Sequence, residues 1–174
     1  MEIRRAWSMP SSNTFSIKPI REMINKELTS GIIIDPFANN SILKKFIVNQ
    51  TYITNDLDEQ YNTDYHLDAL EFFKIFEDAS VDMVLYDPPY SPRQVSECYT
   101  LLDKTVDFKT TQSSYWTNHK KEISRIVKSG GKVITFAWNS GGIGKKYGFK
   151  IKDILLVAHG GWHNDTICTV EIKI

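Results

Sequence analysis

Residues 81–90, Val81-Asp82-Met83-Val84-Leu85-Tyr86-Asp87-Pro88-Pro89-Tyr90, decide how this chain folds. The first six are mostly apolar, a pattern typical of a strand buried on both faces of a parallel sheet. Two consecutive prolines cannot continue a central strand, because neither has an amide hydrogen to donate. We therefore expect the strand to end at Tyr86 and a stiff turn to carry Asp87 to the edge of the sheet.

Strands and helices alternate on the N-terminal side of this stretch. Pro19 suits the first turn of a helix that reaches Leu28, and Gly31 is expected to end it. Ile32-Ile33-Ile34 is a short β-branched run that predicts another buried strand. Further elements are predicted as a helix over 43–47, a strand over 51–54 and a helix over 68–76.

The C-terminal side predicts a helix over 115–127, ended by Ser129-Gly130-Gly131, and a strand over 132–137. Two strand-like runs follow, 151–158 and 166–174, and the short polar turn between them favours an antiparallel hairpin. We predict an α/β fold: a mostly parallel sheet with a C-terminal antiparallel hairpin, in a three-layer sandwich. Residues 1–174 are expected to form a single domain.

Composition narrows the classes of function. Lys and Arg total 21 and Asp and Glu total 21, so no global positive field attracts nucleic acid, and any such contact must be local. No apolar run is long enough for a membrane span, and no signal-peptide core follows Met1. Cys98 and Cys168 form no paired motif. We expect a cytoplasmic protein without a membrane partner.

Acidic residues follow three predicted strands, as Asp35, Asp56 and Asp87. Ligands of open α/β sheets bind beyond the carboxyl ends of the strands, so these acids should meet at the ligand site. Asp56 is suited to accept hydrogen bonds from both hydroxyls of a ribose, with Asp58 as the alternative. A turn or capping role for each carboxylate is the competing interpretation.

The turn at 87–90 has the chemistry of a catalytic site. Asp87 and the Pro88 carbonyl are suited to accept both hydrogens of an exocyclic amine, which directs the lone pair of the nitrogen toward an incoming methyl group. Pro89 stiffens the same turn. Tyr90 offers a flat face for a base taken out of its stack.

These residues resemble the DNA amino-methyltransferases, specifically the adenine-N6 branch with an Asp-Pro-Pro-Tyr motif. The resemblance covers most of the chain and implies the Rossmann-like fold of S-adenosylmethionine-dependent methyltransferases, with Asp87, Pro88, Pro89 and Tyr90 as catalytic residues. It implies S-adenosylmethionine as cofactor and DNA, with a flipped adenine, as partner. The cofactor-binding residues that it implies are Phe15, Ile17, Lys18, Asp35, Pro36, Phe37, Ala38, Asn39, Asp56, Leu57, Asp68 and Ala69.

The chain departs from the family pattern in two ways. The glycine loop here reads Phe37-Ala38-Asn39-Asn40-Ser41, where Asn39 is expected to replace a glycine at positive φ and Ser41 to cap a helix. No region is large enough for a target-recognition domain. This predicts relaxed sequence specificity, a homodimer or a partner subunit, as in compact methyltransferases of phages and mobile elements.

Other residues are candidates for contact with the substrate. Trp138 and Asn139 follow the strand at 132–137, and Arg93 follows the catalytic turn. His159 and His163 are separated by two glycines in a hairpin, so we expect no metal site. Two other functions stay open: N-methylation of an RNA base, and a binding module that has lost its catalytic activity.

Overall fold

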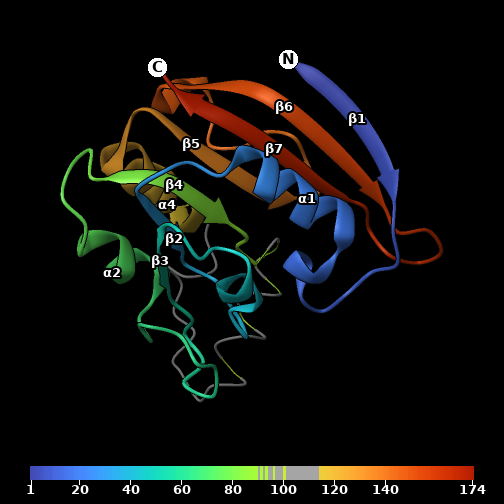
Figure 1. The fold of residues 1–174 in the computed structure, drawn as a ribbon, viewed down its shortest axis with the longest axis horizontal. Helices are drawn as coiled ribbons and strands as arrows, with labels where there is room; N and C mark the ends of the chain where they lie inside the picture. Colours follow the sequence, from blue (N-terminus) through green and yellow to red (C-terminus); the bar gives the residue numbers. More distant parts are fainter. Residues whose placement is uncertain (90, 92, 94–95, 97–99, 101–113) are drawn as a thin grey trace.

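The computed structural model describes residues 1–89, 91, 93, 96, 100 and 114–174. Within these residues a seven-stranded sheet crosses the molecule in the order β1-β6-β7-β5-β4-β2-β3 (Figure 1). The strands are β1 Glu2–Trp7, β2 Ile32–Asp35, β3 Thr51–Thr54, β4 Val81–Tyr86, β5 Val127–Ala137, β6 Phe149–Ala158 and β7 Thr166–Lys173. The helices are α1 Lys18–Glu27, α2 Ala69–Lys74 and α4 Ser114–Ile126, with 3-10 turns η1 Thr14–Ser16, η2 Ile42–Lys45 and η3 Lys145–Tyr147.

Strand directions confirm the predicted fold class. β7 runs antiparallel to both β5 and β6, and every other pairing of the sheet is parallel. β4 ends at Tyr86, one residue before the two prolines, which lack the amide hydrogens that a longer strand would need. The switch between β2 and β4 leaves the ends of β2, β3 and β4 together at one edge of the sheet, where open α/β folds bind ligands.

The sheet separates two apolar cores, which makes three layers (Figure 1). Ile33 of β2 points to the core under α1, and its neighbour Ile34 points to the opposite core under α2 and α4. The side chains of a strand alternate between its faces, so each central strand contributes to both cores. This two-sided burial accounts for the continuous apolar runs in the sequence.

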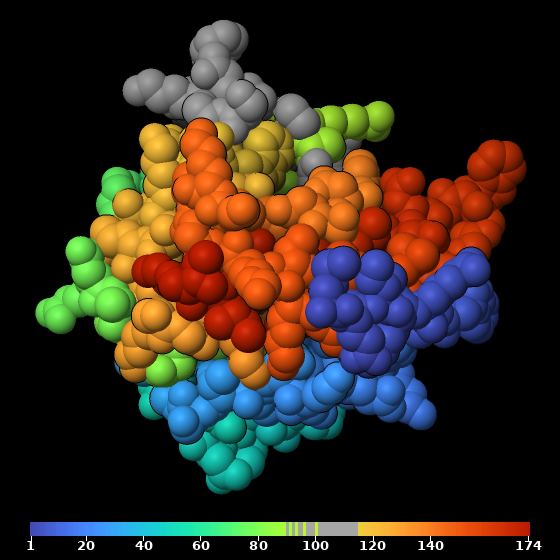
Figure 2. Space-filling model, turned by 90° about the horizontal axis from the view of Figure 1, so that it is seen from above, coloured from blue at the N-terminus to red at the C-terminus, as the bar shows by residue number. Residues whose placement is uncertain are grey.

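β1 is the element for which the sequence offered no prediction. It pairs in parallel with β6, and Figure 2 shows the N-terminal segment (blue) beside the C-terminal ones (orange to red). Ile3 and Trp7 are exposed at this edge, and Arg4 bonds Asp153 at 2.7 Å. An edge strand with one exposed face and two arginines lacks the apolar run that identified the other strands.

Helix ends were predicted less well than helices. α1 ends at Glu27, so Gly31 does not cap it; instead Gly31 lies before β2 at φ +98°. A Cβ at Gly31 would lie 2.1 Å from an Asp82 carboxylate oxygen, so it is close packing that requires glycine there. The helix predicted over 43–47 is only the 3-10 turn η2.

The helix end predicted at Ser129-Gly130-Gly131 is also misplaced. α4 ends at Ile126, and β5 begins directly at Val127, so the glycines lie inside the first part of the strand. Register between β4 and β5 shifts there, between Val81 and Met83, and Gly130 has φ +78°. The glycines therefore accommodate an irregularity in a strand rather than a helix end.

Among residues 1–89, 91, 93, 96, 100 and 114–174, no helix is long and apolar enough to cross a bilayer.

Candidate active site

The three predicted acids lie at the edge formed by β2, β3 and β4, close enough that the charges of Asp56 and Asp87 act on Asp35. Asp35 is fully buried, and its pKa is raised to about 8, first by burial and further by the negative charges of Asp87 and Asp56. Its Oδ2 accepts a hydrogen bond from the Tyr52 hydroxyl at 2.7 Å, and its Oδ1 accepts one from the Phe37 amide at 3.2 Å. Asp35 is therefore an acid held largely protonated at neutral pH.

The altered glycine loop has the backbone that Asn39 was predicted to supply. Asn39 has φ +49° and Ser41 φ +51°, so two non-glycine residues of this loop are left-handed. Asn tolerates this region better than most residues. Ser41 stands at the N-cap position of η2 but makes no side-chain cap bond, so its predicted capping role is wrong; its left-handed backbone prevents the extended geometry that a cap uses.

Asp56 holds the loops at the ends of β2 and β3 together. Its Oδ2 accepts from the Asn39 amide at 2.8 Å, and its Oδ1 accepts from the Asp58 amide at 3.0 Å. Burial raises the pKa of Asp56, and the two amide bonds oppose that rise. Each carboxylate oxygen keeps a second lone pair that could accept a ribose hydroxyl, and ribose binding by Asp56 stays a prediction. The neighbouring Leu57 packs against Tyr115.

Asn55 is a positioning residue that the sequence analysis did not single out. It is 1% exposed, and its Nδ2 donates to the Pro36 and Leu67 carbonyls at 3.1 and 3.0 Å. Its Oδ1 accepts from the Leu67 amide at 2.9 Å, and its own carbonyl accepts from the Ala38 amide at 2.9 Å. One buried side chain thus fixes three segments of the candidate cofactor site.

Two further cofactor candidates lie at the start of α2. Asp68 caps this helix, because its Oδ1 accepts from the Leu70 amide at 2.9 Å, and Ala69 is buried at the first position. The negative charge of Asp68 also acts on His119 of α4. This places the segment at 68–70 near the aromatic cluster described below, while its predicted contact with a cofactor stays untested.

The N-terminal candidates divide between core and surface. Phe15 and Ile17 are buried in the α1-side core, where the Phe15 ring packs edge-on against Phe136 at 5.0 Å. Lys18 is exposed and pairs only loosely with Glu22, at 3.9 Å. Their cofactor role therefore stays a prediction.

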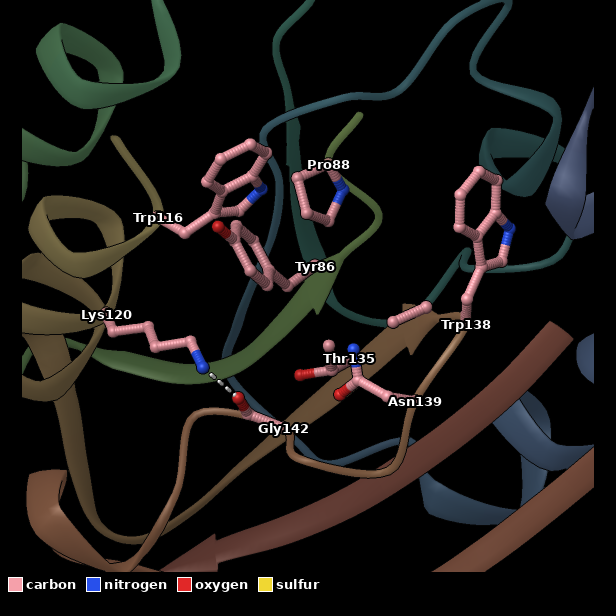
Figure 3. Close-up of a pocket in the computed structure, with 9 residues that line it drawn as sticks. Tyr86, Pro88, Trp116, Lys120, Thr135, Trp138, Asn139 and Gly142 are labelled. Carbon is pink, nitrogen blue, oxygen red and sulfur yellow. Dashed lines mark hydrogen bonds between the residues drawn. The ribbon is translucent and has the colours of Figure 1, made fainter. Parts of the chain in front are cut away.

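The turn at 87–89, predicted to be catalytic, opens onto a cavity of about 280 Å³. Pro88 lines it, and the Pro89 carbonyl accepts a hydrogen bond from the Trp116 indole at 3.1 Å, which anchors the turn to α4. Trp138 and Asn139, both predicted to meet the substrate, line the same cavity (Figure 3). Tyr90 lies outside the described residues, so its stacking role stays a prediction.

Two polar residues of the cavity wall were not predicted as site residues: Lys120 of α4 and Thr135 of β5. In the sequence, Lys120 lies within the helix predicted over 115–127 and Thr135 within the strand predicted over 132–137. Neither residue could be predicted as a site residue from the sequence, because the two face one cavity only after α4 packs beside β5. Arg93, a further predicted substrate contact, is exposed beyond the turn.

His119 lies at the centre of an aromatic cluster next to this wall. Its ring lies 4.3 Å from that of Tyr115, and its Nδ1 is 3.0 Å from the Tyr86 hydroxyl. Burial lowers the pKa of His119 to about 4, so the ring is neutral at physiological pH. The cluster, completed by Phe37 and Phe73, links β2, α2, β4 and α4 behind the site.

His159 has a structural role in the hairpin. Its ring nitrogens lie 2.9 Å from the Ser8 carbonyl and 2.9 Å from the Thr166 hydroxyl, which connects the end of β1 to β7. Both ring nitrogens are thus engaged by protein atoms.

Comparison with known proteins identifies the fold. No protein-family model and no curated protein sequence matches the chain. TrmN from Thermus thermophilus superposes with a TM-score of 0.59 and 16% identity over 91% of this chain and 49% of that one, so the chain spans about half the length of TrmN.

Two other solved methyltransferases match over more of their own length. The 1,6-didemethyltoxoflavin-N1-methyltransferase of Burkholderia thailandensis, solved with 1,6-didemethyltoxoflavin and S-adenosylhomocysteine, gives a TM-score of 0.64 and 10% identity, covering 93% of this chain and 79% of that one. Precorrin-6y C5,15-methyltransferase of Geobacter metallireducens gives a TM-score of 0.61 and 12% identity, covering 95% of this chain and 94% of that one. The chain therefore has the Rossmann-like methyltransferase fold.

Proposed function

We propose that this protein transfers a methyl group from S-adenosylmethionine to the N6 amine of adenine in DNA. The observation that carries the proposal is the rigid Asp87-Pro88-Pro89 turn, which ends a central strand beside a cavity lined by Trp116 and Trp138. The cavity, about 280 Å³, is at the small end of ligand sites, about 300–1,000 Å³. A single planar base suits such a space.

The described residues fit the cofactor that the fold implies. The loop at 37–41 has the left-handed backbone that lets a chain approach a ligand closely, and Asp56 lies at the end of β3, where a ribose-binding acid belongs. S-adenosylmethionine bound there supplies an electrophilic methyl group and retains the electron pair of the broken bond on sulfur. Methyltransferase neighbours solved with S-adenosylhomocysteine support this assignment.

The chain's own residues then have three tasks. Asp87 and the Pro88 carbonyl accept the two amine hydrogens, which keeps the nitrogen lone pair free for bond formation. The carboxylate stabilises positive charge as it develops on that nitrogen. The surplus proton leaves after the new bond has formed, so no residue needs to act as a base beforehand. Trp138 and Tyr90 are the proposed stacking surfaces.

Methyl incorporation from labelled S-adenosylmethionine tests this function. We expect label in DNA as N6-methyladenine, identified by mass spectrometry of the nucleosides. Asp87→Ala should reduce the rate about 100-fold or more, because it removes the group that stabilises the developing charge. The matched control is Asp78→Ala, which removes an exposed carboxylate beside Arg125 and should leave the rate unchanged.

Two alternatives predict different results. Label in ribosomal or transfer RNA with none in DNA would favour an RNA base N-methyltransferase. Absence of S-adenosylhomocysteine binding in calorimetry would favour a catalytically inactive module. An Asp87→Ala variant as active as the parent would contradict the proposed role of this turn.

A further inference from the structure

Lys120 reaches from α4 into the wall of the cavity beside the catalytic turn (Figure 3). Its ammonium donates one hydrogen bond, at 2.5 Å, to the carbonyl of Gly142. A Lys ammonium has three hydrogens and no acceptor, so two donors are left for other partners. Among the described residues no carboxylate lies within ion-pair distance of it.

Glu171, the acid whose charge acts on Lys120, does not neutralise it. Glu171 raises the pKa of the ammonium, but burial lowers that pKa more strongly. Both Glu171 oxygens already accept backbone amides, from Ile143 at 2.6 Å and from Gly144 at 2.9 Å. Lys120 is thus half-buried in a cavity wall with donor capacity that its described neighbours do not use.

Thr135 provides a second, independent sign that a ligand belongs here. It lines the same cavity and is 5% exposed, yet among the described residues its hydroxyl has no hydrogen-bond partner. A buried polar group without a partner costs free energy, so a group in a cavity wall is expected to pair with a ligand or with water. Asn139 adds a donor to the same wall. Its Oδ1 accepts a hydrogen bond from the Gly141 amide, which leaves the NH₂ group of its side chain as a donor.

Nucleobases differ in the group that lies beside the exocyclic amine. In adenine and cytosine the one ring nitrogen beside the amine accepts a hydrogen bond, whereas in guanine the amine lies between a ring N–H that donates and a ring nitrogen that accepts. A wall that presents donors pairs with a ring acceptor and leaves a ring N–H unpaired. An unpaired polar group in a closed site carries a large penalty, which makes such a wall selective.

We propose that Lys120, together with the Thr135 hydroxyl, determines substrate specificity by donating to the ring nitrogen beside the target amine. The site then accepts an amine flanked by a ring acceptor, as in adenine, and disfavours guanine bound with its ring N–H toward the wall. This inference rests on the proposed methylation of a base amine and deepens it. Lys120 is assigned to recognition of the base edge, and Asp87 to the amine itself.

Base analogues test the proposal without altering the protein. 1-Deazaadenine keeps the amine but lacks the adjacent ring nitrogen, and 7-deazaadenine keeps both. In matched duplexes that contain only one of these bases or adenine, the wild-type kcat/KM should fall about tenfold or more with 1-deazaadenine. With 7-deazaadenine it should change by no more than about threefold.

Variants identify the responsible group. Lys120→Met should lose about tenfold or more on adenine and should methylate adenine and 1-deazaadenine at similar rates. Lys121→Met, which removes the same charge from the exposed neighbour on α4, should keep the wild-type preference. Thr135→Val should raise KM about threefold without lowering the melting temperature, because the isosteric change removes an unpartnered hydroxyl.

The outcomes separate this inference from the proposed function. Wild-type enzyme that methylates adenine and 1-deazaadenine equally would overturn the role of Lys120 while leaving adenine methylation intact. A preference for 7-deazaadenine over 1-deazaadenine that persists in Lys120→Met would also overturn it. Wild-type enzyme without activity on any base would overturn both.

Discussion

Asp35 shows how a buried site keeps an acid uncharged. Burial between Tyr52 and the Phe37 amide raises the pKa of its carboxyl to about 8, and the negative charges of Asp87 and Asp56 add to that rise. The unfolded chain would release this proton near pH 3.8, so between that pH and about 8 the folded state holds one proton more. The contribution of Asp35 to stability is therefore full below pH 3.8 and is lost as pH rises through about 8.

Asp35→Asn should remove this pH dependence. The amide matches the protonated acid in shape, and it can donate to the Tyr52 oxygen while accepting from Phe37. Between about pH 5 and about pH 8, the free energy of unfolding of the wild type should fall relative to the variant by about 1.4 kcal/mol per pH unit. Urea denaturation at several pH values measures it.

Asp78→Asn is the control for this prediction, because it changes an exposed carboxylate and should leave the slope as in the wild type. A wild type and an Asp35→Asn variant with parallel stability profiles would show that Asp35 is ionised in the folded protein. The assigned burial effect would then be wrong.

At the scale of an element, the loop between β2 and η2 depends on backbone geometry more than on side-chain chemistry. Asn39 lies at φ +49°, and its amide donates to Asp56, so the conformation of one residue positions the proposed ribose-binding acid. Asn39→Gly should keep the fold and the binding of S-adenosylhomocysteine. Asn39→Ala should cost about 1 kcal/mol, because alanine tolerates the left-handed region poorly.

Chemical denaturation and calorimetry of the two variants measure this difference. Lys45→Ala serves as the control, since Lys45 is exposed in the adjoining turn η2 and has no positive φ. Alanine and glycine variants of Asn39 with equal stability and equal affinity would mean that the loop does not need the left-handed conformation.

The same elements show which features a sequence can reveal. The left-handed Asn39 and the end of β4 follow from local rules on φ and on amide hydrogens, so both were predictable. β1 escaped because an exposed edge strand carries no apolar run, and its pairing with β6 spans most of the chain. The sequence did not identify the site residues Lys120, Thr135 and His119, because their environment forms only when α4 packs on the sheet.

At the scale of the whole molecule, the charges are balanced and partly paired. Lys and Arg equal Asp and Glu in number, and several cations are bound to acids within the fold. Arg125 bonds Glu122 and Asp78, Lys128 bonds Asp82, and Lys152 bonds the buried Glu27. Exposed cations without an acid at ion-pair distance among the described residues include Lys121, Lys145, Lys146 and Lys150, so a small group of cations is available to neutralise phosphates.

This balance predicts weak dependence of DNA binding on salt. A protein that contacts about two phosphates loses only about tenfold in affinity when salt rises from about 50 to about 200 mM, whereas six to ten contacts cost about a thousandfold or more. We expect the smaller loss for non-specific duplexes, measured by fluorescence anisotropy. Lys145→Ala/Lys146→Ala, which removes two exposed charges, should weaken binding slightly, and Glu71→Lys should strengthen it by a similarly small factor.

A steep salt dependence of the isolated chain would contradict this view and would place the DNA-binding cations in residues outside the described ones. The shallow dependence, combined with methylation of adenine, would instead mean that recognition depends on the base pocket. A chain that contacts only one flipped base does not contact the neighbouring bases, so its sequence specificity should be low unless a second subunit adds base contacts. Sequencing of methylated sites at increasing enzyme concentration would then show broad, weakly selective modification.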